Sequence, residues 1–238
     1  MVSSLITIVV PTSPIAIHPS TRMIEQAVDS VIAQLPAATL VITADHGTND
    51  EYVKQLPHKW SNVTVQGPAP IKLHQSGMMG NALAVVRTPY VLYWEHDWQL
   101  VGPVEWEGLV RLLEQREFNS IKLHAGARIS PYHEYLMEDR LLYQHDDAAR
   151  TIYDHHVGGS PLAVIRTRQW SQNPHLARTD WYCDIHHRYL IDRVDFIENI
   201  VHMIVSASNW EDFKLGIYNP IGNDMLRVRH LDGAGTKD

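Results

Sequence analysis

Short apolar runs punctuate the first half of the chain at regular intervals. Each run is four to six residues long, rich in β-branched or aromatic side chains, and most lack the strict alternation of a half-exposed strand. Such runs are typical of strands buried on both faces of a sheet. We therefore predict strands at residues 5–10, 39–43, 63–66 and 90–94.

Between these runs, apolar residues recur at the spacing of a helix. Met23, Ala27, Val31 and Leu35 are spaced four apart, which predicts an amphipathic helix that Pro36 ends. Two further helices are expected, a short one at residues 49–55 and a longer one at residues 76–86. This alternation predicts an α/β fold, a Rossmann-like and mostly parallel sheet flanked by helices.

The pattern changes after about residue 125. A helix at residues 103–117 and a strand at residues 120–124 continue the alternation, but aromatic, histidine and charged residues then mix without a clear period. Two glycines at positions 158 and 159 indicate a hinge before a strand at residues 162–165. The other expected elements are a hairpin at residues 141–144 and 151–154 and helices at residues 167–172, 181–191 and 196–205.

The composition excludes some classes of protein. The 238 residues include 45% hydrophobic and 20% charged residues, as in an ordinary globular domain. The net charge of −7 argues against an extended basic face for nucleic acid, and no apolar run approaches the roughly 18 residues that span a membrane. The single cysteine, Cys183, is expected to be a small buried apolar residue. Because no basic residue precedes the first apolar run, we expect a cytoplasmic protein without a signal peptide.

The strongest candidate for chemistry is the acidic triplet that follows the fourth predicted strand. Glu95, His96 and Asp97 stand where a buried strand emerges from the sheet, and ligands bind at the carboxyl ends of strands in open α/β sheets. The two carboxylates would share one side of a continuing extended backbone. Their oxygens suit a hard divalent cation, which usually keeps water and phosphate ligands as well. The triplet therefore predicts a metal–diphosphate site.

Several short motifs occur in a particular order along the chain. They are Val-Pro-Thr ending the first strand, Asp-His-Gly-Thr after the second, Gly-Asn-Ala in the third helix and Glu-His-Asp after the fourth strand. Together they resemble the inverting glycosyltransferases of family two, which have the glycosyltransferase A fold with a smaller C-terminal acceptor lobe. The resemblance implies one glycosyltransferase domain over residues 1–238. Its nucleotide-sugar-binding half would be residues 1–100, and its acceptor half and C-terminal tail residues 101–238.

The resemblance also implies a donor and residues that bind it. The donor is a nucleoside diphosphate sugar, with a UDP-sugar favoured. Pro11 and Thr12 match backbone that contacts the nucleoside, and Asp45 matches an acid that usually pairs with the base, although a histidine replaces the second acid of that turn. Gly80 and Asn81, near a helix start, would let a phosphate approach closely, and tight packing of the helix explains the glycine equally well.

The metal would lie at the acidic triplet. By resemblance the ion is Mn²⁺ or Mg²⁺, Asp97 is its direct ligand, Glu95 reaches the ribose or the metal, and His96 lies between them. His230 is similar to a tail histidine that often completes the metal site. A surface histidine after a strand fits that part of the sequence nearly as well.

Direct displacement with inversion needs a base that deprotonates the acceptor hydroxyl. By resemblance this base begins a helix after a glycine-rich hinge, which points to Asp184 or Asp180, although the Glu-Asp pair of the family is absent at both. Arg188 follows Asp184 by one helical turn and could orient it, which favours Asp184. Asp180 is equally explained as a helix N-cap.

Two other functions remain open from the sequence. Histidines with carboxylates are good zinc ligands, so a zinc hydrolase could use the histidine-rich middle of the chain, although its spacings match no zinc pattern. An inactive nucleotide-sugar-binding module would explain the absent Glu-Asp pair. The sequence does not specify the acceptor, and a saccharide, a protein or a modified DNA base would each fit. We expect no membrane partner. The residues of the zinc alternative are His145, Asp146, His155, His156, His186 and His187.

Overall fold

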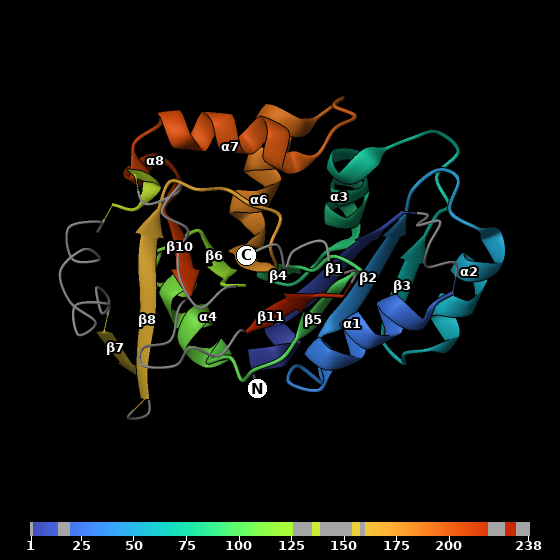
Figure 1. Ribbon diagram of the computed structural model, residues 1–238, viewed down its shortest axis with the longest axis horizontal. Helices are drawn as coiled ribbons and strands as arrows, with labels where there is room; N and C mark the ends of the chain where they lie inside the picture. The colour runs from blue at the N-terminus through green and yellow to red at the C-terminus, as the bar shows by residue number, and fades with distance from the viewer. Residues whose placement is uncertain are drawn as a thin grey trace.

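A mixed sheet runs through the centre of the protein, with helices on both faces (Figure 1). The computed structural model describes residues 2–13, 20–125, 135–138, 154–157, 160–218 and 227–231. Within these residues, nine strands form the sheet in the order β3-β2-β1-β4-β9-β6-β10-β8-β7. They are β1 (Ile6–Thr12), β2 (Thr39–Ala44), β3 (Val63–Gln66), β4 (Tyr90–Tyr93), β6 (Ser120–Leu123), β7 (Asp154–Val157), β8 (Ser160–Thr167), β9 (His175–Arg178) and β10 (Leu215–Tyr218).

The longer helices form a layer on each face of the sheet. α1 (Arg22–Ile32) and α4 (Trp106–Glu114) pack on one face, whereas α3 (His74–Val85), α6 (Thr179–Ile185) and α7 (Ile197–Ala207) cover the other (Figure 1). Side chains of successive strand residues point to opposite faces of the sheet. One set therefore packs against α1 and α4, and the other against α3, α6 and α7. Shorter elements are α2 (Asp50–Gln55), α8 (Trp210–Phe213), a π-helix (His186–Leu190) and 3-10 turns at Val2–Leu5 and Leu56–His58.

Most strands of the sheet run in one direction. β1 pairs in parallel with β2 and β4, and β2 with β3, so their carboxyl ends meet at one edge. β9 is antiparallel to both β4 and β6, and β8 is antiparallel to β10 and β7. Every strand except β8 and β9 therefore shares one direction, and the predicted fold class is confirmed. None of the described helices is long and apolar enough to cross a membrane.

A second, two-stranded sheet brings the C-terminal segment to the end of β4. β5 (Trp98–Leu100) pairs antiparallel with β11 (Val228–His230), and His230 lies opposite Trp98. Backbone hydrogen bonds from Val101 to Arg227 and from Leu231 to Asp97 extend this pairing on both sides. Residues 227–231 are thus fixed against the residues that follow β4.

The expected elements of the first half are present, with ends shifted by a few residues. The second half needs corrections. The helix expected at residues 167–172 is wrong, because β8 continues to Thr167 and no helix follows it before β9. Cys183 is exposed on α6, not buried as expected, because the apolar face of that helix is formed by its neighbours. The expected hairpin at residues 141–144 and 151–154 and the hinge at 158–159 lie essentially outside the described residues.

Candidate metal and nucleotide site

Glu95 lies just beyond β4, where two neighbours hold its carboxylate. The Tyr93 hydroxyl donates to Glu95 Oε1 at 2.9 Å, and Nε2 of Gln75, in the first turn of α3, donates to the same oxygen at 2.6 Å. Burial, together with the charge of Asp97, raises the pKa of Glu95 to about 7. Glu95 is therefore only partly ionised at neutral pH.

Asp97 is held by the C-terminal segment. Nε2 of His230 lies 3.2 Å from Asp97 Oδ2, and the backbone N–H of Leu231 donates to the Asp97 carbonyl at 2.7 Å. The His230 ring packs edge-on against Trp98, with ring centroids 4.9 Å apart. Burial alone would raise the pKa of Asp97, but the hydrogen bond from His230 and the charges of His96 and His230 bring it below its usual value. The structure thus brings His230 and Asp97 together, with the carboxylate ionised.

The other oxygen of Asp97 is unsatisfied. Oδ1 is buried and has no hydrogen-bond partner in the described part of the chain, and Nε2 of His96 is in the same condition. A buried polar atom without a partner is unfavourable and normally binds something. A hard cation would bind this oxygen, and Mg²⁺ needs only one or two carboxylates in addition to water and phosphate. The Asp97–His230 pair therefore fits the Mn²⁺ or Mg²⁺ that the resemblance implies.

The three-residue metal set of Asp97, Glu95 and His230 is not formed. Across the described ranges, no three His, Cys, Asp or Glu side chains are grouped so that they could hold one ion. The extended backbone assumed for the triplet ends after β4, where the chain turns and the Trp98 N–H donates to the Glu95 carbonyl at 3.2 Å. After this turn the hydrogen bonds of the Glu95 carboxylate go to Tyr93 and Gln75, whereas Asp97 and His230 act on it through their charges.

The residues predicted for the nucleoside lie at the same edge, where β1 and β2 end. Asp45 follows β2, and its carboxylate accepts the backbone N–H groups of His46, Leu73 and His74 at 2.7, 2.7 and 3.0 Å. These bonds fix the start of α3 to the end of β2. Oδ2 accepts only one of the three hydrogen bonds, so it can accept another from a ligand. Thr12 Oγ1 lies 3.3 Å from the Tyr52 hydroxyl.

Pro11 is linked directly to the acidic turn. Its carbonyl lies 3.2 Å from Nδ1 of His96, so β1 and the turn after β4 are connected by a side chain of the triplet. Pro11, Thr12 and Asp45 share this edge with Asp97 because β1, β2 and β4 are parallel.

Gly80 and Asn81 lie in the middle of α3. A Cβ atom at Gly80 would lie 2.6 Å from Nε2 of His186, and that nitrogen is 3.0 Å from the Ser76 carbonyl. Asn81 is exposed. The space beside Gly80 is filled by protein, which favours the packing interpretation of this glycine over a phosphate contact.

Asp180 lies at the other edge of the sheet from Asp97. It follows Arg178, which is opposite Tyr90, the first residue of β4. There its carboxylate binds the Arg178 guanidinium and accepts the Trp181 backbone N–H at 2.7 Å. The antiparallel direction of β9 therefore separates Asp180 from the acidic turn by the length of β4.

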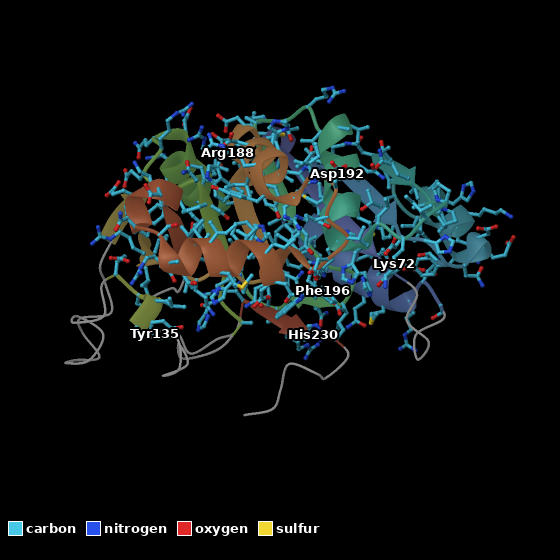
Figure 2. The ribbon with its side chains drawn as sticks, turned by 90° about the horizontal axis from the view of Figure 1, so that it is seen from above. Lys72, Tyr135, Arg188, Asp192, Phe196 and His230 are labelled. Atoms are coloured by element: carbon cyan, nitrogen blue, oxygen red, sulfur yellow. The ribbon has the colours of Figure 1, made fainter. Side chains whose placement is uncertain are left out.

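Asp184 is on the exposed face of α6. Nε of Arg188 donates to Asp184 Oδ1 at 2.8 Å, as the helical spacing predicted. The opposite face of α6, with Tyr182 and Ile185, packs on the sheet. Figure 2 shows Arg188 on the opposite side of the molecule from His230. The structure does not bring Asp184 together with Asp97.

A buried stack of rings behind Glu95 was not identified from the sequence. His175, on β9, stacks between Tyr93 and Tyr182 with ring centroids at 4.9 and 5.6 Å. Its Nδ1 is 2.9 Å from the Asn173 carbonyl, and its Nε2 is 3.3 Å from the Tyr182 hydroxyl. Burial lowers the pKa of His175 to about 4, so the ring is neutral. Its neighbours come from three separate segments, so no sequence spacing marks it.

The zinc alternative has little geometric support. His186 packs against Gly80, and His187 is exposed on the π-helix. The remaining four residues of that hypothesis, or their side chains, lie outside the described part: His145, Asp146, His155 and His156.

The mostly parallel sheet with helices on both faces matches solved structures with the glycosyltransferase A fold. The chain is similar to residues 1–349 of S. aureus TarS, with a TM-score of 0.57 and 11% identity over 96% of this chain and 60% of that one. TarS in complex with UDP matches with a TM-score of 0.56, 11% identity, and coverage of 94% and 59%. The mannosyltransferase PcManGT from Pyrobaculum calidifontis, in complex with GDP-Man and Mn²⁺, matches with a TM-score of 0.55, 12% identity, and coverage of 90% and 54%.

These likenesses establish the fold. The chain spans 60% or less of the length of these three structures. Neither a family model nor a curated protein sequence matches the chain.

Proposed function

We propose that this protein is a metal-dependent glycosyltransferase. It transfers a hexosyl or pentosyl group from a nucleoside diphosphate sugar, with a UDP-sugar favoured, to an acceptor hydroxyl with inversion. One observation carries the proposal: the unpartnered Oδ1 of Asp97, beside His230, at the carboxyl end of β4. Solved structures of two proteins of this fold are complexes, one with UDP and one with GDP-Man and Mn²⁺, which supports a donor of this chemistry.

The side chains after β4 would bind the metal, and those at the ends of β1 and β2 would bind the nucleoside. Asp97 and His230 would hold the Mn²⁺ or Mg²⁺, which when bound neutralises the charge that develops on the diphosphate as the sugar bond breaks. His230 positions Asp97 by binding Oδ2, which leaves Oδ1 facing the ligand. The nucleoside would lie along the ends of β1 and β2, at Thr12 and Asp45.

Inversion also needs a general base on the acceptor side of the donor sugar. Asp180 is at the amino end of β4, and Asp184 is exposed on the far side of α6. A base has to lie within hydrogen-bond reach of the acceptor hydroxyl, directly or through one water. We therefore assign the base to neither aspartate.

A thermal-shift experiment with nucleoside diphosphates tests the donor site. Ligands that bind only the folded state raise the melting temperature. UDP with Mn²⁺ at about a hundred times the dissociation constant should raise it by about 5 °C or more in a chain of this size. UDP without metal should give little shift. The Asp97→Asn variant, which keeps the shape but not the charge of this side chain, should lose the metal-dependent part.

The control for this experiment is Glu51→Gln. Glu51 is an exposed carboxylate paired with Lys54 on α2, so its loss should leave the shift unchanged. An undiminished shift in Asp97→Asn would remove Asp97 from the site. Release of UDP from a UDP-sugar, measured with saccharide, protein and DNA acceptors, then separates a transferase from an inactive binding module.

A further inference from the structure

A small cavity lies beside the central strand β9, on the face of the sheet that α6 and α7 cover. It is bounded by β6, the start of β9, β10 and the segment that precedes β9. The cavity has a volume of about 10 Å³. That is room for about one atom or small group of water's size. The polar residues that line it are Ser120, Lys122, Gln169, Ser171 and His175, with Trp170 beside them.

Lys122 supplies a buried cation to this cavity. Lys122 is only 8% exposed, and its Nζ donates to Gln169 Oε1 at 2.9 Å. An ammonium has three N–H donors, so one amide oxygen leaves it under-satisfied. Burial lowers the pKa of Lys122 to about 8, an effect that the charge of Glu198 opposes, so the side chain is still largely charged at neutral pH. Glu198 is not among the described residues that line the cavity, and a buried charge without a direct partner is costly.

Two more polar atoms at the cavity have no partner. Nε1 of Trp170 and Oγ of Ser171 are both buried and make no hydrogen bond to the described residues. Trp170 is 3% exposed, and its indole nitrogen can only donate. The neutral ring of His175 cannot supply the missing acceptor, because both of its nitrogens are already bonded, to the Asn173 carbonyl and the Tyr182 hydroxyl.

The named polar groups at the cavity therefore include an excess of donors, and none of its described lining residues is a carboxylate. We propose that this cavity binds one small monovalent anion, a halide ion or the carboxylate end of a larger molecule, on Lys122, Trp170 and Ser171. The anion would neutralise the Lys122 ammonium and accept from the Trp170 indole and the Ser171 hydroxyl. A water molecule would satisfy the two neutral donors but not the charge.

The cavity is close to the ring stack behind Glu95. Tyr93, His175 and Lys122 are directly paired across β4, β9 and β6, and the Tyr93 and His175 rings stack on one face. Lys122 is thus two strands from Tyr93, about 10 Å away at the usual strand spacing. The anion site does not depend on the donor site being correct, because none of its residues belongs to it.

The first test is crystallographic. Crystals of the wild-type chain grown in sodium bromide and in sodium formate, without chloride, show directly what the cavity holds. We expect an anomalous bromide peak within hydrogen-bond distance of Lys122 Nζ, and a planar formate in its place in the second crystal. Bromide alone would identify a free-halide site, and formate alone a carboxylate site. Water in both crystals would overturn the proposal.

The second test uses stability and a matched pair of variants. Replacing sodium sulfate by sodium formate or bromide at equal ionic strength should raise the wild-type melting temperature, relative to Lys122→Met, by about 3 °C or more. The comparison within each salt cancels the general effect of salts on stability. Lys54→Met, which removes a surface ammonium, should respond as the wild type does. An equal response in wild type and Lys122→Met would refute anion binding at Lys122.

Discussion

Glu95 and Asp97 are separated by one residue, and their surroundings shift their pKa values in opposite directions. Burial would raise the pKa of Asp97, but the contact of His230 with one carboxylate oxygen lowers it below its usual value. Glu95 is buried near that charge, and its pKa is raised to about 7. A charged neighbour of the same sign and a loss of water both disfavour ionisation. At residue scale the site is therefore asymmetric, with Asp97 suited to a cation and Glu95 to a hydrogen-bond network.

This asymmetry predicts the effect of Glu95→Gln on stability. The folded pKa of Glu95 is above its unfolded value of 4.5, so its stabilising contribution is complete below about pH 4.5 and is lost as the pH rises through 7. Glutamine keeps both acceptor contacts without the charge. In the metal-free protein, Glu95→Gln should therefore gain about 2 kcal/mol over wild type at pH 8 relative to pH 5.

Urea unfolding in the presence of a chelator measures this difference. Glu51→Gln, on an exposed carboxylate, should show no such gain with pH. If the stability of Glu95→Gln relative to wild type were the same at pH 5 and pH 8, Glu95 would not be titrating in this range.

Only part of this site could be predicted from the sequence. A strand followed by acids located Asp97, and the resemblance located His230, because both signals are local in the chain. Gln75 comes from a helix and His175, which stacks on Tyr93, from a later strand, and each is an ordinary residue in its own segment. The turn after β4 also separated Glu95 from Asp97, and a turn of this kind has no glycine or proline to announce it.

At the scale of elements, α3 is shaped by its contact with the π-helix after α6. The His186 ring lies where a side chain at Gly80 would be, and it is bonded to the Ser76 carbonyl. Glycine inside a helix costs about 1 kcal/mol relative to alanine. The close approach of His186 gives this glycine a structural reason.

A double-mutant cycle tests that reason. Gly80→Ala should destabilise the wild type by about 1–2 kcal/mol, because Cβ would displace the ring and break its hydrogen bond. In the His186→Ala background the same change should stabilise by up to about 1 kcal/mol, since only the helix propensity remains. Chemical unfolding of the four proteins measures the coupling. The same effect in both backgrounds would show that His186 is not the obstacle.

The strands and helices of the first half could be predicted from apolar runs and helical spacing, whereas β9 could not. Its sequence, His-Leu-Ala-Arg, is four residues long and has one polar residue at each end. It is a strand because β4 and β6 supply hydrogen-bond partners on both sides. Such tertiary pairing overrides local preference and leaves no local pattern.

At the scale of the whole molecule, β9 joins β3, β2, β1 and β4 to β6, β10, β8 and β7 in the sheet. His175 is buried at this junction, and burial, aided by the nearby Lys122 charge and opposed by the Asn173 carbonyl, lowers its pKa to about 4. Protonation would place a charge between two stacked tyrosine rings. Global stability in acid should therefore depend on this one residue.

The sign and window of this dependence follow from the pKa values. The folded pKa of His175 is below the unfolded value of 6.5, so the unfolded chain binds more protons, and stability falls as the pH drops below 6.5 toward 4. His175→Phe keeps the ring but cannot titrate. Between pH 6.5 and 4.5, wild type should lose about 2–3 kcal/mol more than this variant in urea unfolding. Parallel pH profiles for the two proteins would contradict the assignment.

The most direct test of the donor site is a crystal soaked with Mn²⁺ and UDP, examined by anomalous scattering at the manganese edge. We expect one manganese peak bonded to Asp97 Oδ1, next to His230, with the diphosphate on its open side and the uridine toward Thr12 and Asp45. Manganese bound elsewhere, or a fully occupied UDP with Asp97 turned away from it, would refute a metal–diphosphate site at Asp97.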